Sequence, residues 1–307
     1  MKKLGVVGTM IWDTFITGRS GLPREEWGGI GYALAALDAA LPDDWKIVPL
    51  VKVGADLAPK AAEFLRGISA AAPGSRFVEV TEPNPRVTLA YIDNERRCEG
   101  LKGGVPPWTW EELGPLTLGL DALYCNFITG FETNLETMRA LRHAFKGPIY
   151  GDIHSLALGR APDGTRYYRP VDEALHWLTA FDVAQVNEDE MAQLGAGDPF
   201  EIAGKALLHG TKSVVVTLGP RGAVYFTKEG GSLVKTSLVA VEGGPVEGDP
   251  TGCGDVFGGT LAARLLAGAE IETAIRDANR AARRNVSYRG ASGLQHHLRG
   301  ALQELRA

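Results

Sequence analysis

Short continuous apolar runs alternate with longer segments in which apolar residues recur at helical spacing along most of the chain. The runs at 4–8, 47–53, 120–125, 149–152, 183–187 and 214–218 have the length of buried strands. Helical spacing covers 33–41, 58–68, 135–145, 171–181, 255–267 and 272–288. Strands that alternate with helices predict a mostly parallel sheet with right-handed crossovers, so the expected fold class is α/β.

This alternation is interrupted between 77 and 105. Three short runs of β type, at 77–80, 86–93 and 97–101, are separated there by prolines and by Asp93-Asn94-Glu95, which has the composition of a hairpin turn. We expect these strands, with the irregular segment 14–27, to form a small β-sheet lid over a ligand crevice, because a lid excludes water. The predicted division is a core made of 1–13, 28–76 and 106–307, and a discontinuous lid made of 14–27 and 77–105.

Composition and charge narrow the class of protein. The 307 residues are 45% hydrophobic and 22% charged, which is typical of a globular protein. The net charge of −5 and the lack of a Lys/Arg-rich tract argue against nucleic acid as the main ligand. No apolar run approaches the ~18 residues of a membrane span, and we recognise no targeting signal, so we expect a cytoplasmic protein without a membrane partner. Cys98, Cys125 and Cys253 are too few and too scattered for a disulfide framework or a zinc site.

The strongest chemical signal is the sequence Gly-Asp-Pro-Thr-Gly-Cys-Gly-Asp-Val-Phe-Gly-Gly at 248–259. Gly252 and Gly254 allow a tight turn and a close approach of a ligand to the backbone N–H groups. The predicted helix begins at Asp255, and a helix N-terminus stabilises negative charge. Asp255 can take a proton from an attacking hydroxyl while the N–H groups hold phosphoryl oxygens. The alternative is a glycine-rich turn with an Asp that stabilises the helix dipole, and the Cys253 thiol is interpreted as a small space-filling group rather than a redox centre.

Polar residues follow several of the predicted strands. Because the carboxyl ends of parallel strands share one edge of the sheet, Asp13, Asn126, Asp152 and Asn187 are expected to line one crevice. Asn187 and Glu190 also have the spacing of a capping box, which needs no function. The functional alternative is that Glu190 orders a water-coordinated magnesium ion while Asn187 reaches a phosphate, and the two roles can coexist.

Taken together, these residues resemble the PfkB (ribokinase-like) carbohydrate kinases over nearly the whole chain. The segment 249–255 is similar to the family's Asp-Thr-Gly-Ala-Gly-Asp signature, with an additional Pro and with Cys in place of Ala. Supporting motifs, in family order, are Gly28-Gly29, Val53-Gly54-Ala55-Asp56, residues 187–190, Val216-Thr217-Leu218-Gly219 with Gly222, and Asn279. The resemblance implies a ribokinase-like three-layer α/β/α core with a β-sheet lid, and transfer of the ATP γ-phosphoryl group to a hydroxymethyl group.

Candidate roles follow from this resemblance and from the strand-end positions. Asp255 is the expected base, and Gly252, Cys253 and Gly254 are the expected anion hole. The expected ATP-binding residues are Asn187, Thr217, Gly219, Gly222 and Asn279. The expected acceptor-binding residues are Asp13, Gly28, Gly29, Tyr32 and Asn126. Glu190 would hold Mg²⁺ through water, and Asp249, with the loop 289–292, resembles the site at which many members bind a monovalent cation such as K⁺.

Two departures from the family pattern leave the acceptor open. Many sugar kinases read Gly-Gly-x-x-x-Asn, but here Ala33 stands at the Asn position. Where a strand of the family often ends Asp-x-Asn-x-Arg, this chain reads Asp152-Ile153-His154-Ser155. Trp12, Tyr32 and Phe127 are aromatic side chains that can stack on a base or lie in the core. The expected function is therefore an ATP-dependent sugar kinase, with a nucleoside kinase and a non-catalytic ligand-binding relative as alternatives. Lid strands often pair subunits in this family, so a homodimer formed through the lid is also expected.

Overall fold

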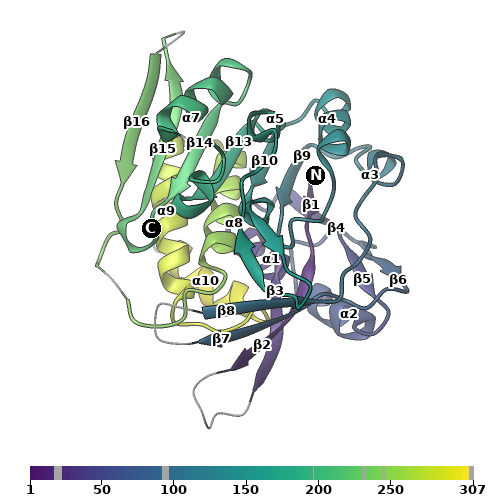
Figure 1. The fold of residues 1–307 in the computed structure, drawn as a ribbon. Coiled ribbons are helices and arrows are strands. Elements are labelled where there is room, and N and C mark those ends of the chain that lie inside the picture. Colours follow the sequence, from purple (N-terminus) through teal and green to yellow (C-terminus); the bar gives the residue numbers. More distant parts are fainter. Residues whose placement is uncertain (17–22, 92–96, 196, 231–232, 245, 304–307) are drawn as a thin grey trace.

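The computed structural model describes residues 1–16, 23–91, 97–195, 197–230, 233–244 and 246–303 (Figure 1). The predicted turn at Asp93-Asn94-Glu95 and the middle of the predicted lid segment 14–27 lie outside this part of the chain. Among the described helices, none has the length and apolar character that would let it cross a bilayer.

An eight-stranded sheet forms the centre of the molecule, with the strand order β16-β15-β14-β13-β10-β9-β1-β4. Neighbouring strands from β4 to β14 pair in parallel, whereas β15 and β16 are added antiparallel. The bounds are β1 (Lys2–Val7), β4 (Trp45–Leu50), β9 (Ala122–Asn126), β10 (Ile149–Asp152), β13 (Val183–Asn187), β14 (Ser213–Thr217), β15 (Ala223–Glu229) and β16 (Leu233–Val239). The predicted apolar runs form the parallel strands because both of their faces are covered by helices.

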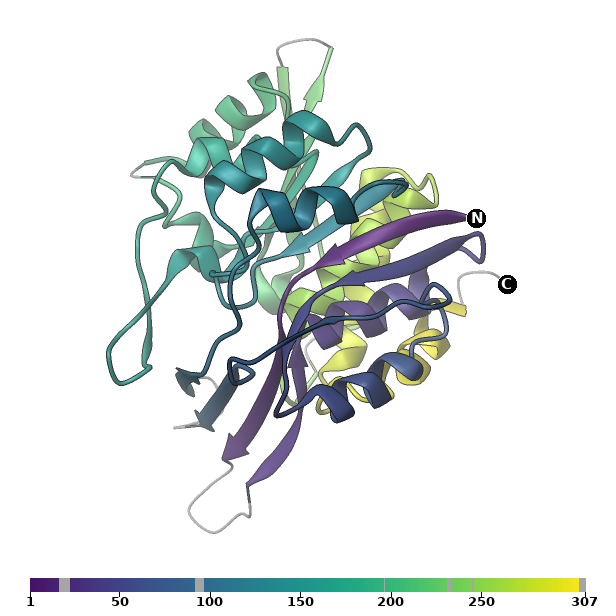
Figure 2. The same cartoon turned by 90° about the vertical axis from the view of Figure 1, so that its right-hand side faces the viewer.

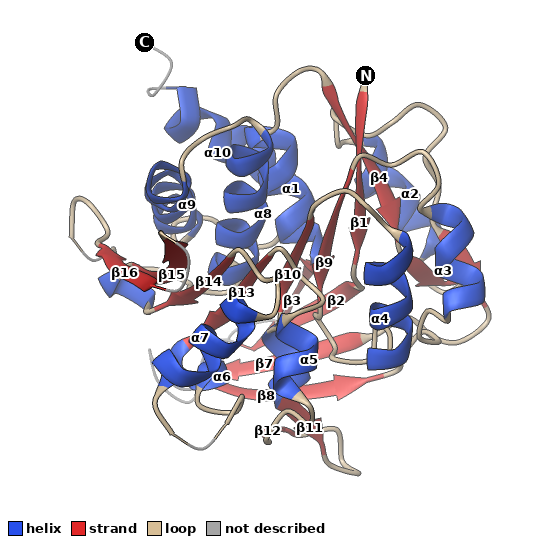
Figure 3. Ribbon diagram, turned by 90° about the horizontal axis from the view of Figure 1, so that it is seen from above, coloured by secondary structure: helices blue, strands red, loops and turns tan. Residues whose placement is uncertain are grey.

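Helices cover both faces of the sheet (Figure 3). One face carries α1 (Ile30–Ala40), α8 (Cys253–Leu266), α9 (Ile271–Asn285) and α10 (Leu294–Gln303), whose apolar side chains join one buried cluster that also includes α2 (Ala58–Arg66). The other face carries α3 (Trp110–Leu116), α4 (Leu135–Ala144), α5 (Ala174–Leu178), α6 (Glu188–Met191) and α7 (Pro199–Leu208), which pack on a second cluster. The predicted three-layer α/β/α core is confirmed.

A separate four-stranded sheet, with the order β3-β2-β7-β8, projects from one end of the core (Figure 2). Its strands are β2 (Met10–Ile16), β3 (Arg24–Gly29), β7 (Arg86–Tyr91) and β8 (Arg97–Lys102). We call this sheet the lid. The predicted lid segments coincide with it in part, because β2 begins at Met10 and β6 (Val78–Val80) pairs instead with β5 (Lys52–Gly54).

Some elements have bounds that differ from the prediction or were not predicted. The helix expected over 171–181 is limited to α5, and the run at 47–53 is divided between β4 and β5, which lie in different sheets. The helices α3, α7 and α10, the edge strand β16 and the small hairpin of β11 (Leu158–Arg160) and β12 (Arg166–Tyr168) complete the described fold.

The C-terminal helix α10 is fastened to α1 by a buried carboxylate. Asp38 accepts hydrogen bonds from Ser69 Oγ at 2.8 Å, from the Ala70 N–H at 2.6 Å and from Arg299 Nη2 at 2.7 Å. The side chain of Asp38 is 0% exposed, so each of these bonds replaces hydration that the carboxylate has lost.

Asp38→Asn should therefore lower the free energy of unfolding by roughly 1–3 kcal/mol. The amide keeps the shape of the side chain but lacks the negative charge that strengthens the hydrogen bonds from Arg299 and the other donors. Urea unfolding measures this change. Asp43→Asn, at an exposed position a few residues away, is the matched control and should stay within about 0.5 kcal/mol of the parent. Equal stability of the two variants would contradict the prediction.

Candidate active site

A cavity of about 310 Å³ lies where the carboxyl ends of the central strands, the start of α8 and the lid meet. Its lining consists of Ile11, Asp13, Gly29, Tyr32, Val87, Leu89, Glu99, Ile128, Asp152, His154, Gln185, Asn187, Glu190, Thr217, Gly219 and residues 250–255. Most of the residues predicted from the strand ends and from the 248–259 sequence are therefore brought together. The lid contributes Asp13 from β2, Val87 and Leu89 from β7, and Glu99 from β8.

The backbone conformation of the loop before α8 depends on one glycine. Gly252 caps the helix with φ of 78°, in the left-handed region that disfavours side chains. A Cβ atom at this position would also overlap the ring of Tyr32. The loop therefore presents its backbone at the N-terminus of a 14-residue helix, where unpaired N–H groups and the helix dipole favour an anion.

Asp255 lies in the first turn of α8, half-buried in the cavity wall. Asn126, the last residue of β9, donates a hydrogen bond from Nδ2 to Asp255 Oδ1 at 2.8 Å. Burial raises the pKa of Asp255 above its ordinary value, while the charge of His154 and the bond from Asn126 oppose this increase. A carboxylate with a raised pKa and a fixed orientation is suited to accept a proton.

Gln185 joins two parts of the site and was not singled out from the sequence. Its Nε2 lies 3.1 Å from Asp152 Oδ2 and 3.0 Å from the Gly254 carbonyl oxygen, so it links the end of β10 to the start of α8. Burial raises the pKa of Asp152 well above its usual range. The signal in the sequence was a polar residue inside the apolar run of β13, where a buried side chain needs a hydrogen-bond partner.

The predicted capping box of Asn187 and Glu190 is present. Asn187 Oδ1 accepts from the Glu190 N–H at 2.8 Å, and Glu190 Oε2 accepts from the Asn187 N–H at 2.8 Å, which together begin α6. Glu190 Oε1 also lies 3.0 Å from His154 Nδ1. Burial opposes protonation of His154, but Glu190, Asp255 and Asp152 outweigh it and raise the pKa of His154 to about 10. No local sequence pattern indicated this contact between His154 and Glu190.

The oxygen-rich lining fits a hydrated divalent cation. Asp152, Asn187, Glu190 and Asp255 all line the cavity, and Mg²⁺ prefers oxygen ligands and retains several waters. Within the described residues, His, Cys, Asp and Glu side chains form no group of three or more arranged as a direct metal site. Both carboxylate oxygens of Glu190 are engaged by His154 and Asn187, and its water-mediated role toward Mg²⁺ remains a prediction.

The side of the cavity assigned to the acceptor combines carboxylates with apolar groups. Asp13 is buried in β2, and a side chain at Gly28, on the paired strand, would collide with its carboxylate. Tyr32 lines the cavity, and burial followed by the charges of Asp13, Asp249 and Asp255 raises the pKa of its hydroxyl, which stays protonated.

Of the other aromatic and departure positions, Trp12, Phe127 and Ala33 are absent from the cavity lining, whereas His154 is part of it. Trp12 packs edge-on against Trp27 at a ring distance of 5.0 Å, and Phe127 packs on Trp177 at 5.2 Å, so both belong to the core. Ala33 faces α8, where its backbone meets Gly259. The residue at position 33 therefore packs against α8 in this protein.

Five predicted site residues are not part of the cavity lining: Gly28, Asn126, Gly222, Asp249 and Asn279. Gly222 and Asn279 both meet the end of β16, where Asn279 Nδ2 donates to the Val239 carbonyl oxygen at 2.9 Å. Asp249 Oδ1 accepts from the Thr251 N–H at 2.9 Å, and its Oδ2 lies 3.8 Å from Arg289 Nε. Their nucleotide and cation roles remain predictions.

The Cys253 thiol is directed toward α9 rather than into a redox pair. Its Sγ lies 3.3 Å from the Ala282 carbonyl oxygen and 3.4 Å from Asn285 Nδ2. Asn285 also donates to the Thr251 carbonyl oxygen at 2.9 Å. These contacts hold the loop against α9, in agreement with a space-filling role for the side chain.

Comparison with solved structures defines the class of fold. The chain is 20% identical to a ribokinase of Thermotoga maritima, covering 99% of this chain and 100% of that one with a TM-score of 0.72. It is 18% identical to Arabidopsis thaliana ribokinase complexed with ribose and ATP, covering 98% and 99% with a TM-score of 0.72. It is 16% identical to a Burkholderia thailandensis nucleoside kinase in complex with inosine, covering 99% and 97% with a TM-score of 0.71. The protein therefore has the ribokinase-like α/β fold.

The sequence comparison adds a family match over the C-terminal part of the chain. Residues 160–297 match the model of the pfkB family carbohydrate kinases, which confirms the resemblance indicated by the 249–255 signature. No curated protein sequence matches the chain significantly.

Proposed function

We propose that the protein transfers the γ-phosphoryl group of ATP to a hydroxymethyl group of a small sugar or sugar-like acceptor. The observation that carries this proposal is the position of Asp255 beside the Gly252–Gly254 loop, in a cavity that also contains Asp13. A base, an anion hole and a hydroxyl-binding carboxylate are the groups that phosphoryl transfer to an alcohol requires.

Each residue has a defined part in this reaction. Asp13 and the Tyr32 hydroxyl bind acceptor hydroxyl groups, and Asp255 takes the proton of the hydroxyl that attacks. The N–H groups of Gly252 and Gly254 hold the oxygens of the transferred phosphoryl group, which gains stabilisation from the helix N-terminus. The predicted third donor, the Cys253 N–H, donates to the Pro250 carbonyl oxygen at 3.1 Å. Asn187, Thr217 and Gly219, which also line the cavity, bind the phosphates and the nucleotide of the donor. Mg²⁺ held through Glu190 would neutralise charge on the phosphates.

The experiment that tests the proposal is ADP release measured with a panel of ketoses, ribose and sugar acids. The expected result is at least one acceptor that raises the rate well above that of an Asp255→Asn variant. If ATP binds and no acceptor raises turnover, the protein is a non-catalytic relative and the proposal fails. Parallel assays with and without K⁺ examine the predicted role of Asp249.

A nucleoside is the second candidate acceptor, favoured by the apolar lining of the cavity. Ile11, Val87, Leu89 and Ile128 line the cavity beside Asp13, and aliphatic faces suit a base while a carboxylate suits ribose hydroxyls. Calorimetric titration with inosine, adenosine and free ribose separates the two candidates. Binding of free sugars alone would rule out the nucleoside.

Asn126 is expected to set the pH at which the base works. The base acts only when it is deprotonated, and the bond from Asn126 stabilises the charged form of Asp255. Asn126→Ala removes that bond, so the pKa of Asp255 should rise further. The acid limb of the kcat/KM profile should move to higher pH, with a several-fold loss of rate at mildly acidic pH and convergence toward the parent at alkaline pH. A profile reduced by the same factor at every pH would contradict this role.

A further inference from the structure

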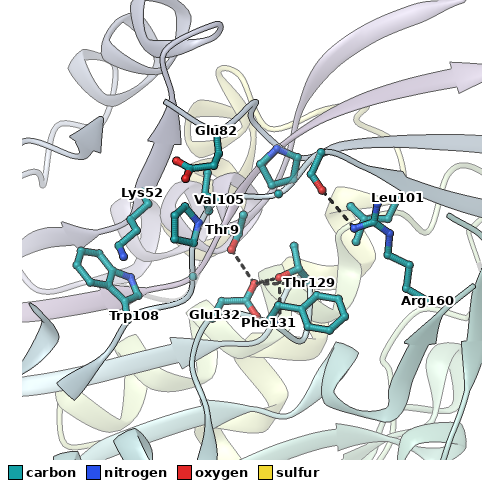
Figure 4. A pocket seen from close by; sticks show the side chains of 15 residues that line it. Thr9, Lys52, Glu82, Leu101, Val105, Trp108, Thr129, Phe131, Glu132 and Arg160 are labelled. Carbon is teal, nitrogen blue, oxygen red and sulfur yellow. Dashed lines mark hydrogen bonds between the residues drawn. The ribbon is translucent and has the colours of Figure 1, made fainter. Parts of the chain in front are cut away.

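A second cavity, of about 440 Å³, lies beside the candidate active site at the junction of lid and core (Figure 4). Among the described residues, none lines both cavities. The lid side is formed by Pro85 before β7, by Leu101 of β8 and by the glycines that follow β8, and the core side includes Thr9 and Lys52. A molecule bound here would contact lid and core at once.

The polar groups at the base of this cavity are already satisfied by the protein. Glu132 is 4% exposed, and its Oε1 accepts from Thr9 Oγ1 at 2.7 Å, from the Thr129 N–H at 2.7 Å and from Thr129 Oγ1 at 2.9 Å. Its Oε2 accepts from the Gly130 N–H at 3.0 Å. Lys52 Nζ donates to Glu112 at 2.8 Å and to the Pro107 carbonyl oxygen at 3.0 Å. The interior therefore does not require a charged ligand at these two side chains.

Two arginines on the β11–β12 hairpin give one end of the cavity an excess of positive charge. Arg160 lines the cavity, and within the described residues it makes one hydrogen bond, of 3.3 Å, to the Gly103 carbonyl oxygen and no ion pair. Arg166 lies behind the lining, with its guanidinium 5.7 Å from the ring centre of Phe131 and Nη2 donating to the Thr129 carbonyl oxygen at 2.8 Å.

The Nε and Nη1 atoms of Arg166 are buried and have no hydrogen-bond partner among the described residues. Burial lowers the pKa of Arg166, the neighbouring Arg160 and Arg169 lower it further, and the nearby carboxylates Glu99 and Glu132 oppose this. The oxygens of Glu132 are bonded elsewhere, so no carboxylate of the described chain pairs with Arg166. Buried donors without partners are expected to meet an anion or water.

The rest of the lining includes apolar groups and the exposed Glu82 carboxylate. In Figure 4 the Phe131 ring lies near Thr129, whereas the Trp108 ring lies beside Lys52, at the other end of the view from Arg160. Flat rings bind well against such surfaces, because aromatic faces stack and exclude water.

We propose that this cavity binds a small molecule that carries one carboxylate or phosphate group on a flat apolar ring. The anionic group lies at Arg160, in the field of Arg166, and the ring lies against Phe131. Because the occupant touches Leu101 of the lid and Thr9 of the core, binding favours one position of the lid relative to the core. The inference does not depend on the proposed kinase activity.

Calorimetric titration of the full chain with benzoate and with phenyl phosphate tests the proposal, and benzamide and phenol are the uncharged controls. We expect at least one of the two anions to bind, with Arg160→Gln weakening that binding by roughly tenfold or more, because a hydrogen bond to a charged group is lost. Arg139→Gln, an exposed arginine on α4, is the matched control and should bind as the parent does.

Two experiments test whether the anion binds in this cavity. Val105→Phe should reduce binding by filling the cavity. Amide hydrogen exchange at residues 103–108 should slow when the anion is added. Equal binding of the uncharged controls, equal binding by Arg160→Gln, or no binding of either anion at millimolar concentration would overturn the proposal. A preference for benzoate or for phenyl phosphate identifies which anionic group the cavity accepts.

Discussion

Asp255→Asn is expected to reduce kcat for ADP formation by roughly 10²- to 10⁴-fold, which is the contribution that a positioned general base makes to proton transfer. The amide keeps the size of the carboxylate and can still accept the bond that Asn126 donates at 2.8 Å. Acceptor and ATP affinities should change little, because the lost interaction belongs to the transition state. Steady-state kinetics with the best acceptor of the panel gives both quantities.

Stability separates this effect from misfolding. Burial raises the pKa of Asp255, so the charged form is disfavoured in the folded protein relative to the unfolded chain. The neutral Asn should therefore leave the melting temperature unchanged or increase it. Asp189→Asn, on the exposed surface of α6, is the matched control and should keep full activity. A variant at position 255 that retains more than about a tenth of the parent kcat would exclude Asp255 as the base.

Gly252→Ala is expected to destabilise the protein by roughly 2–5 kcal/mol and to abolish most turnover. The left-handed backbone at φ of 78° costs a side chain about 1–2 kcal/mol. The overlap of the new methyl group with the Tyr32 ring adds about 1–3 kcal/mol of overpacking. Relief of the overlap must move either the loop or Tyr32, and both line the candidate active site. A displaced anion-hole donor lowers kcat by roughly 10²- to 10³-fold.

Gly254→Ala is the matched comparison, two residues along the same loop. A Cβ atom there meets no other atom within 4 Å, and the backbone is not in the left-handed region. This variant should unfold within about 0.5 kcal/mol of the parent in urea. Similar losses of stability in the two variants would show that the conformation of Gly252 is not the cause.

The elements predicted best from the sequence are those whose surroundings require a single hydrophobic pattern. β10 and β13 have the predicted bounds, because a parallel strand covered on both faces is a nearly continuous apolar run. β16 was not predicted because it is an edge strand whose positions 234–238 are exposed or half-buried, so no continuous apolar run marks it. α7 begins with Asp198 as N-cap and Pro199 at its first position, so a start signal was present although its apolar face is short.

Some residues of the candidate site could be predicted from one local segment, whereas the positions of others depend on the tertiary structure. The proximity of Asp255 and the glycine loop was predicted because one continuous segment contains both the candidate anion site and the candidate base. Asp13 was expected to follow a core strand but lies within β2 of the lid, because β1 is followed almost directly by another strand. The contact of His154 with Glu190 joins residues 36 positions apart, and such pairs depend on sheet order. The periodicity within either segment therefore cannot predict such a contact.

The lining of the candidate active site comes from two structural units. Asp13, Val87, Leu89 and Glu99 are carried by the lid, whereas Asp255 and the loop before it are carried by the core. Replacement of residues on β2, β7 and β8 can therefore alter which molecule is accepted while the sequence of α8 stays intact. For directed evolution, changes at Glu99 would search substrate preference at less risk to the fold than changes at Val87 and Leu89, which belong to the buried hydrophobic cluster.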